Sequence, residues 1–157
     1  MEGVAVMTSE MDQRQLQKLE RQKMPVVLLG VHSKAFHVSN IGINYRTGFR
    51  QAVQHLVALR HERIAFVSGP LTLIPAIERR EAFLRSMEEL RVTVDRDLVV
   101  ACDHSPIEGE RALERIMRLT EKPSAVVCSN DMTAIVMSKS FALGIKNSRR
   151  FVRNWFG

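Results

Sequence analysis

The order of short apolar segments and longer amphipathic segments most constrains the fold of this chain. Six short segments rich in apolar and β-branched residues are predicted strands: 3–8, 25–30, 38–43, 63–69, 97–102 and 123–129. Several are followed directly by a segment of 12–16 residues with helical periodicity. Strands that alternate with helices indicate an α/β fold with a parallel, doubly wound sheet.

Helix-start signals support this interpretation at two joints. Ser9 can cap the first helix, with Asp12 three residues later as an approximate capping box. Ser105 is followed by Pro106, a residue favoured at the first helical position, and Glu108 completes a second box. Both joints follow a predicted strand, as a strand–loop–helix unit requires.

Three further helices are predicted over about 46–60, 76–90 and 132–143. In the first, apolar residues recur on one side of the helix and are expected to face the core: Phe49, Val53, Leu56 and Val57. Asn130 or Asp131 is expected to cap the last helix.

The composition is that of an ordinary globular protein, with 45% hydrophobic and 25% charged residues. No segment has the roughly 18–20 continuous apolar residues of a membrane span, and the first residues lack the pattern of a secretory signal. We therefore expect a cytoplasmic protein with no membrane association. Cys102 and Cys128 both fall in predicted buried strands and are expected to be small core residues, not a disulfide or a metal site.

The formal net charge of +6 does not by itself indicate DNA binding. Four basic residues and no acidic one lie in the last twelve positions, and without these four the chain has 19 basic and 17 acidic side chains. Elsewhere the two signs alternate along helix surfaces, as on solvated faces. No helix-turn-helix or zinc-finger spacing is present, so specific DNA binding by this chain alone is not expected.

Polar residues follow the carboxyl ends of the predicted strands, where ligands bind in sheets of this kind. This predicted polar rim consists of Ser9, His32, Asn44, Thr72, Arg79, His104, Asn130 and Asp131. Such side chains suit a small hydroxylated or charged ligand. The sequence contains no Gly-x-Ser-x-Gly nucleophile motif, phosphate-binding loop, paired carboxylates or metal-ligand spacing, so we expect no enzyme activity and no cofactor.

The order of several motifs resembles the lactose-repressor/galactose-repressor family of bacterial transcription regulators. The similar segments are EGVAVMTSE with MPVVLLG, INYRTGFRQAVQHLVALRHERIAFVSGP, AIERREAF, VVACDHSPIEGERAL and PSAVVCSNDMTAI. Together they cover about residues 2–145, and the Ser-Asn-Asp-Met-Thr-Ala segment is the most specific of them.

The resemblance implies a partial two-lobed fold like that of type I periplasmic binding proteins. Residues 1–69 are expected to form part of the N-terminal lobe, residues 70–145 part of the C-terminal lobe, and residues 146–157 a tail without family match. A small effector, sugar-like in class, is expected in the cleft between the lobes, and the complete protein is expected to be a homodimer. By position, the implied ligand-binding residues are Thr72, Arg79, His104, Asn130 and Asp131.

The chain also departs from the family pattern. The family's helix-turn-helix and the first strand and helix of its N-terminal lobe are absent, so DNA binding would need a domain that this sequence lacks. Arg60 and Ala82 stand where the family favours glycine, and the helix after Asn130 is one residue short. A sugar-binding protein that feeds a transporter, and a truncated copy without function, are therefore alternatives to the effector-sensing core of a regulator.

Overall fold

The computed structural model describes residues 3–8 and 11–144, with side chains up to residue 139. The strands are β1 (Val4–Met7), β2 (Val26–Leu29), β3 (Val38–Ile41), β4 (Ile64–Ser68), β5 (Val99–Ala101) and β6 (Ala125–Cys128). The helices are α1 (Gln13–Arg21), α2 (Tyr45–Ala58), α3 (Ile74–Glu89), α4 (Pro106–Met117) and α5 (Asp131–Gly144), and a short 3-10 helix, η1 (Arg96–Leu98), precedes β5. The predicted α/β class with parallel sheets is confirmed.

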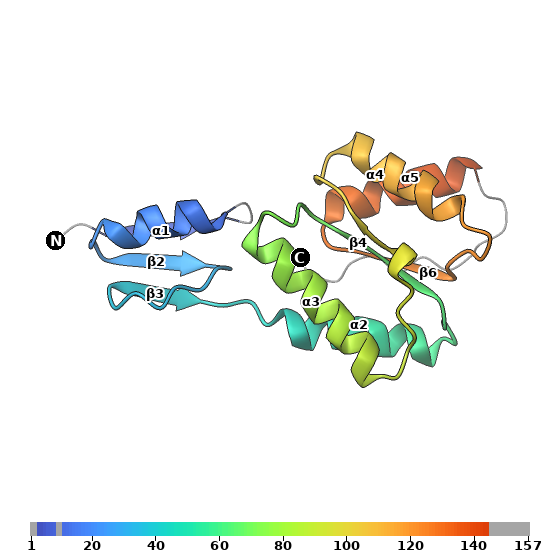
Figure 1. The fold of residues 1–157 in the computed structure, drawn as a ribbon, viewed down its shortest axis with the longest axis horizontal. Coiled ribbons are helices and arrows are strands. Elements are labelled where there is room, and N and C mark those ends of the chain that lie inside the picture. Colours follow the sequence, from blue (N-terminus) through green and yellow to red (C-terminus); the bar gives the residue numbers. More distant parts are fainter. Residues whose placement is uncertain (1–2, 9–10, 145–157) are drawn as a thin grey trace.

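The strands form two separate three-stranded sheets, in the orders β1-β2-β3 and β5-β4-β6, and every pairing is parallel. We call the parts built on them the first and second lobes (Figure 1). The sheet order corrects the expected boundary at residue 69, because β4 pairs with β5 and β6. The chain leaves the first sheet after Ile41 and enters the second lobe at Tyr45. The expected tail 146–157 lies outside the described residues.

The second lobe has helices on both faces of its sheet (Figure 1). On one face, α2 and α3 enclose a cluster in which Phe66 stacks on Phe83 at 4.5 Å between centroids and meets Phe49 edge-on at 5.6 Å. On the other face, α4 and α5 cover a cluster that contains Ile116, Met137 and both cysteines. All five residues of β4 are buried, as expected for the central strand of a doubly wound sheet.

The first lobe packs α1 on one face of its sheet (Figure 1). The connection between β2 and β3 is short and contains no helix, and side-chain hydrogen bonds hold it instead. The Ser33 N–H donates to Asn40 Oδ1 at 2.9 Å, Asn40 Nδ2 donates to the Ser33 carbonyl at 2.8 Å, and the Ser33 hydroxyl donates to Glu20 on α1. These bonds fix the loop that carries His32.

Two local predictions need correction. Asp12, not Ser9, is the N-cap of α1: its carboxylate accepts from the Gln15 N–H at 2.7 Å, and Gln15 Oε1 accepts from the Asp12 N–H. Ser9 itself lies outside the described residues. Val57, expected in the core, is 36% exposed, since it lies at the margin of the buried stripe of α2. The cap formed by Ser105, which accepts from the Glu108 N–H, is confirmed.

The C-terminus of α2 explains why glycine is favoured at position 60. Arg60 has φ of 65°, in the left-handed region, and its N–H donates to the Val57 carbonyl at 2.9 Å. The His61 N–H donates to the Leu56 carbonyl at 3.0 Å, which completes a Schellman motif. An arginine in this conformation is strained because its Cβ approaches the backbone, whereas a glycine is not.

The substitution Arg60→Gly is therefore expected to raise the free energy of unfolding by about 1 kcal/mol. Arg118, which ends α4 with φ of −82°, provides the matched control. Arg118→Gly relieves no strain and should be neutral or destabilising. Urea unfolding followed by circular dichroism measures both, and destabilisation by Arg60→Gly would contradict this explanation.

The face of the first sheet opposite α1 is apolar, and no helix among the described residues covers it. Met7 is 81% exposed and Ile41 56% exposed, and both lie on this face with the half-buried Val27 and Leu29. β1 also presents a free edge in the described part of the sheet. Exposed apolar surface beside an unpaired edge favours self-association.

We expect the 157-residue chain expressed alone to self-associate in size-exclusion chromatography. The double variant Met7→Lys, Ile41→Lys should shift it toward smaller species, because it places charge on the apolar face. Lys substitutions at Ile107 and Met132, which are exposed on α4 and α5, serve as the control and should leave the profile unchanged. A sharp monomer peak with a cooperative melt for the unmodified chain would show the prediction to be wrong.

Candidate functional site

The ends of both sheets meet at the junction between the lobes (Figure 1). The loop after β2 carries His32, and the loop after β4 leads into α3. The first residue of α3, Ile74, packs in the core of the first lobe, and its N–H donates to the Met11 carbonyl at 3.2 Å. The start of α3 is therefore fixed to the first lobe, while the rest of the helix packs in the second.

Arg79 on α3 is half-buried and anchored at the carboxyl end of β6. Its Nη1 donates to the Ser129 carbonyl at 3.2 Å, and its Nη2 donates to the Tyr45 hydroxyl at 3.3 Å. The guanidinium carbon also lies 5.0 Å from the centre of the Tyr45 ring, within cation–π range. These contacts hold the Arg79 guanidinium between Tyr45 at the start of α2 and the end of β6.

His104 approaches the same point from the β5–α4 loop. Its Nε2 lies 3.4 Å from the Ser129 hydroxyl, and its backbone has φ of 68°. The ring lies directly over Gly69, because a Cβ built on Gly69 would come within 2.0 Å of the His104 Nε2. Left-handed backbone in a non-glycine residue is enriched at functional sites. The Asp103 carboxylate next to it accepts from the Ser105 hydroxyl and N–H, which lowers the pKa of Asp103.

The remaining predicted residues differ in their placement. Asn130 follows Ser129, and its Oδ1 accepts from the Thr133 N–H at 3.1 Å, so the predicted helix cap is confirmed. Asp131 is exposed in the first turn of α5. Thr72 is exposed in the turn before α3, and no described contact joins it to the others. The structure thus brings Arg79, His104 and Asn130 together around Ser129.

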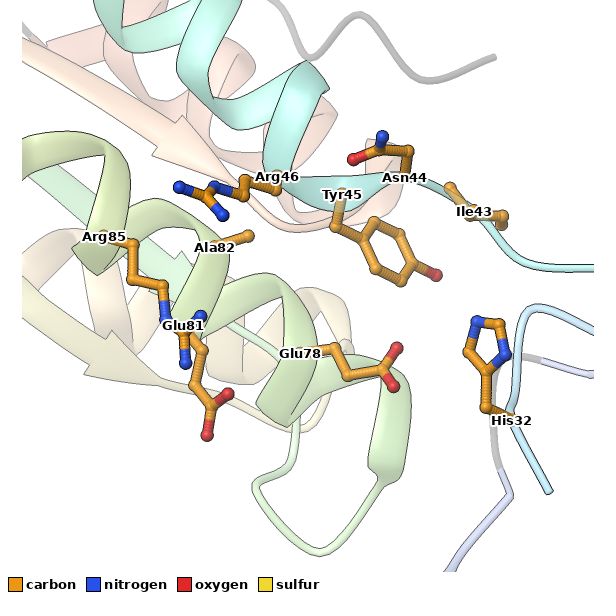
Figure 2. A pocket seen from close by; sticks show the side chains of 9 residues that line it. All are labelled: His32, Ile43, Asn44, Tyr45, Arg46, Glu78, Glu81, Ala82 and Arg85. Atoms are coloured by element: carbon orange, nitrogen blue, oxygen red, sulfur yellow. The ribbon is translucent and has the colours of Figure 1, made fainter. Parts of the chain in front are cut away.

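An open pocket of about 250 Å³ lies at the lobe junction (Figure 2). It is lined by His32, Ile43, Asn44, Tyr45, Arg46, Glu78, Glu81, Ala82 and Arg85. His32 and Asn44 belong to the predicted polar rim. Arg79 is not one of these lining residues, but it donates a hydrogen bond to the hydroxyl of Tyr45, which is one of them.

Sequence reasoning missed Tyr45, Glu78 and Ser129. None of the three is part of a local motif that distinguishes a ligand-binding residue from an ordinary helix-start, charged or strand-end residue. The sequence does contain a signal for Ser129. It lies between a buried strand and the capping Asn130, which is the strand-end position where ligands bind in such sheets. Burial raises the pKa of Glu78 above its ordinary value; Glu81 adds to this rise, while His32 and Arg79 oppose it.

Both cysteines are buried and free. Burial raises the pKa of Cys128 to about 12, so its thiol stays protonated and unreactive at neutral pH. In the part of the chain that the structure describes, no group of three histidine, cysteine, aspartate or glutamate side chains is placed to hold a metal ion. No helix there is long and apolar enough to cross a membrane.

Comparison with protein families matches residues 1–148 to the model of periplasmic binding proteins and the sugar binding domain of the LacI family. The transcriptional repressor PurR of Aliivibrio salmonicida is 27% identical over 92% of this chain and 44% of that protein. The probable repressor ExuR of Bacillus subtilis is 26% identical with the same coverage. The chain therefore spans less than half the length of these relatives.

Solved structures show the same fold. A regulatory protein of the LacI family from Chloroflexus aggregans superposes with a TM-score of 0.80 at 21% identity, over 96% of this chain and 54% of that one. A sugar-binding LacI-family regulator from Escherichia coli, solved with phosphate, gives a TM-score of 0.77 at 19% identity, over 95% of this chain and 54% of that one.

The contact between Gly69 and His104 can be tested by a double-mutant cycle. Gly69→Ala is expected to destabilise the chain by about 1–3 kcal/mol, because the new methyl group must displace the His104 ring. In a His104→Ala background the same substitution should cost only a few tenths of that. Urea unfolding of the four proteins gives the coupling energy. Equal costs in both backgrounds would mean that the ring does not lie over Gly69.

Proposed function

Because this chain belongs to the family of periplasmic binding proteins and LacI sugar-binding domains, we propose that it is the effector-sensing part of a bacterial transcriptional regulator. It binds a small, sugar-like metabolite at the junction of its two lobes. The observation that carries the proposal is the convergence of Arg79, His104 and Asn130 around Ser129, beside the junction pocket.

The chemistry of these groups suits a polyhydroxylated ligand. Arg79 uses one donor on the Ser129 carbonyl and one on the Tyr45 hydroxyl, and a guanidinium has five in a rigid fork. The Asn130 Oδ1 is engaged by the helix cap, which leaves its NH₂ group as a donor toward a ligand oxygen. Glu78 and Glu81 in the pocket supply acceptors for hydroxyl groups.

The full set proposed to contact the ligand is Thr72, Arg79, His104, Asn130 and Asp131. Thr72 is exposed just before α3 and Asp131 is exposed in the first turn of α5, and we assign both to a part of the ligand that extends beyond the pocket. The chemistry is reversible binding without catalysis and without a cofactor.

The curated relatives are longer than this chain, which covers 44% of the length of each of the two described above. The remaining partners are therefore proposed by analogy with those longer proteins. We propose that DNA is bound by a domain outside this chain, that the complete regulator is a homodimer, and that it acts in the cytoplasm. Repression or activation of transcription would follow from the ligand's effect on the angle between the lobes.

Arg79→Ala is expected to weaken ligand binding by about 1.5–3 kcal/mol, the range for a hydrogen bond to a charged group. Isothermal titration calorimetry with a panel of monosaccharides, sugar phosphates and nucleobases identifies a ligand of the unmodified chain and then measures the variant. Arg111→Ala is the control, because Arg111 is 71% exposed on α4. Unchanged affinity in Arg79→Ala would remove Arg79 from the site.

A further inference from the structure

The carboxylate of Glu78 faces the interior of the junction pocket. Glu78 is half-buried on α3, and it lines the pocket together with His32, Asn44 and Tyr45. Figure 2 shows its carboxylate pointing into the gap between α3 and the loop that carries His32, with the Tyr45 hydroxyl directed into the same gap. A ligand that occupies this pocket therefore meets the Glu78 oxygens.

This carboxylate has no partner in the part of the chain that the structure describes. No hydrogen bond or ion pair joins it to the exposed His32 ring or to another described group. Burial raises the pKa of Glu78 above its ordinary value, because it removes part of the water that would stabilise the charge. The charges of His32 and Arg79 oppose this rise without cancelling it. A cation that enters from outside the chain would stabilise such a carboxylate.

Arg79, the residue after Glu78, is engaged elsewhere. Its Nη1 donates to the Ser129 carbonyl at 3.2 Å, and its Nη2 donates to the Tyr45 hydroxyl at 3.3 Å. These bonds hold the guanidinium at the carboxyl end of β6 and not on the Glu78 carboxylate. The Tyr45 hydroxyl accepts from Arg79 and keeps its own hydrogen, which it can donate to a ligand hydroxyl.

The two arginines that line the pocket are offset by other acidic residues. Arg46 on α2 is paired with Glu89, with 2.5 Å between its Nη2 and the Glu89 Oε1. Arg85 lies four residues after Glu81 on α3, and residues at this spacing share one side of a helix, so their opposite charges partly cancel. The uncompensated charge that points into the gap is therefore that of Glu78.

We propose that the junction pocket takes a ligand with a protonated amino group and that Glu78 recognises this group. Within the sugar-like class of the proposed function, on which this inference rests, the ligand is an amino sugar. An ammonium group offers three donors, and its hydrogen bond to a carboxylate is roughly twice as strong as one between neutral groups. A hydroxyl group in the same place lacks this attraction, so Glu78 favours the amino sugar over the parent sugar.

Isothermal titration calorimetry of the full chain with matched sugars tests this assignment at pH 6.5, where a sugar amine is protonated. The probes are glucosamine, galactosamine and mannosamine, each with its parent hexose and its N-acetyl derivative, in which the nitrogen carries no charge. We expect one amino sugar to bind about ten- to a hundredfold more tightly than both of its neutral counterparts.

The same titrations distinguish failure of this assignment from failure of the proposed function. If a hexose or a sugar phosphate binds and no amino sugar binds more tightly, the amino-sugar assignment is overturned and the proposed function stands. If none of the sugars, sugar phosphates or nucleobases binds, both are overturned.

A charge-removing variant tests the role of Glu78 in recognition. Glu78→Gln keeps the size of the side chain and should lower the affinity for the amino sugar about ten- to a hundredfold, while the affinity for the parent hexose stays unchanged. Glu110→Gln, which alters an exposed glutamate on α4, is the control and should leave both affinities as they are. An undiminished preference for the amino sugar in Glu78→Gln would remove Glu78 from the recognition of the amino group.

Urea unfolding without ligand tests separately whether Glu78 lacks a partner within the chain. A half-buried carboxylate without a partner opposes folding, so Glu78→Gln should raise the urea midpoint at pH 7, and Glu110→Gln should leave it unchanged. A lower midpoint in Glu78→Gln would mean that the carboxylate makes a stabilising contact inside the chain, and it would overturn the proposal. Circular dichroism confirms that both variants are folded when the sugars are titrated.

Discussion

The buried central strand β4 is the element on which the second lobe depends. It is paired on both edges, with β5 and β6, and both of its faces are covered. Phe66 packs between the rings contributed by α2 and α3, and Ala65 and Val67 face α4 and α5. Burial of these apolar side chains contributes strongly to the stability of the second lobe, because the hydrophobic effect scales with the buried apolar area.

The same strand determines where the candidate site forms. β4 ends at Ser68 and is followed by Gly69, over which the His104 ring lies. β6, paired with β4, ends beside Ser129, which contacts both Arg79 and His104. Parallel pairing brings the carboxyl ends of these strands to one edge, and three separate loops can then place their side chains at one point. The order of the strands in this sheet therefore determines both the burial of β4 and the place where Arg79, His104 and Ser129 meet.

In the described residues, the sheet of the first lobe is covered by helices less completely than the sheet of the second lobe. Its sheet has one helix, and its outer face leaves Met7 and Ile41 exposed. At the junction the two lobes are joined by the Ile74–Met11 hydrogen bond and by the burial of Ile74 in the core of the first lobe. A hinge motion between the lobes would act at this junction, in keeping with the proposed sensing role.

The alternation of apolar and amphipathic segments determined much of this protein by itself. It predicted all six strands, the α/β class, the parallel sheets and the Ser105 and Asn130 caps, because these depend on residues close together in the chain. The resemblance of motifs likewise identified the family that the comparison with residues 1–148 confirms. Arg60 is instructive: its unusual residue type was visible in the sequence, but its left-handed backbone became visible only in the structure.

The tertiary structure alone decided which strands share a sheet and which polar residues meet. The sequence shows that β4 is buried but not that it pairs with β5 and β6, since pairing partners lie tens of residues apart and several orders satisfy the same pattern. For the same reason the predicted site residues did not include Tyr45, Glu78 or Ser129. Local periodicity reports the side of a helix or strand that is buried, whereas a binding site depends on distances between segments that only the packing of the lobes sets.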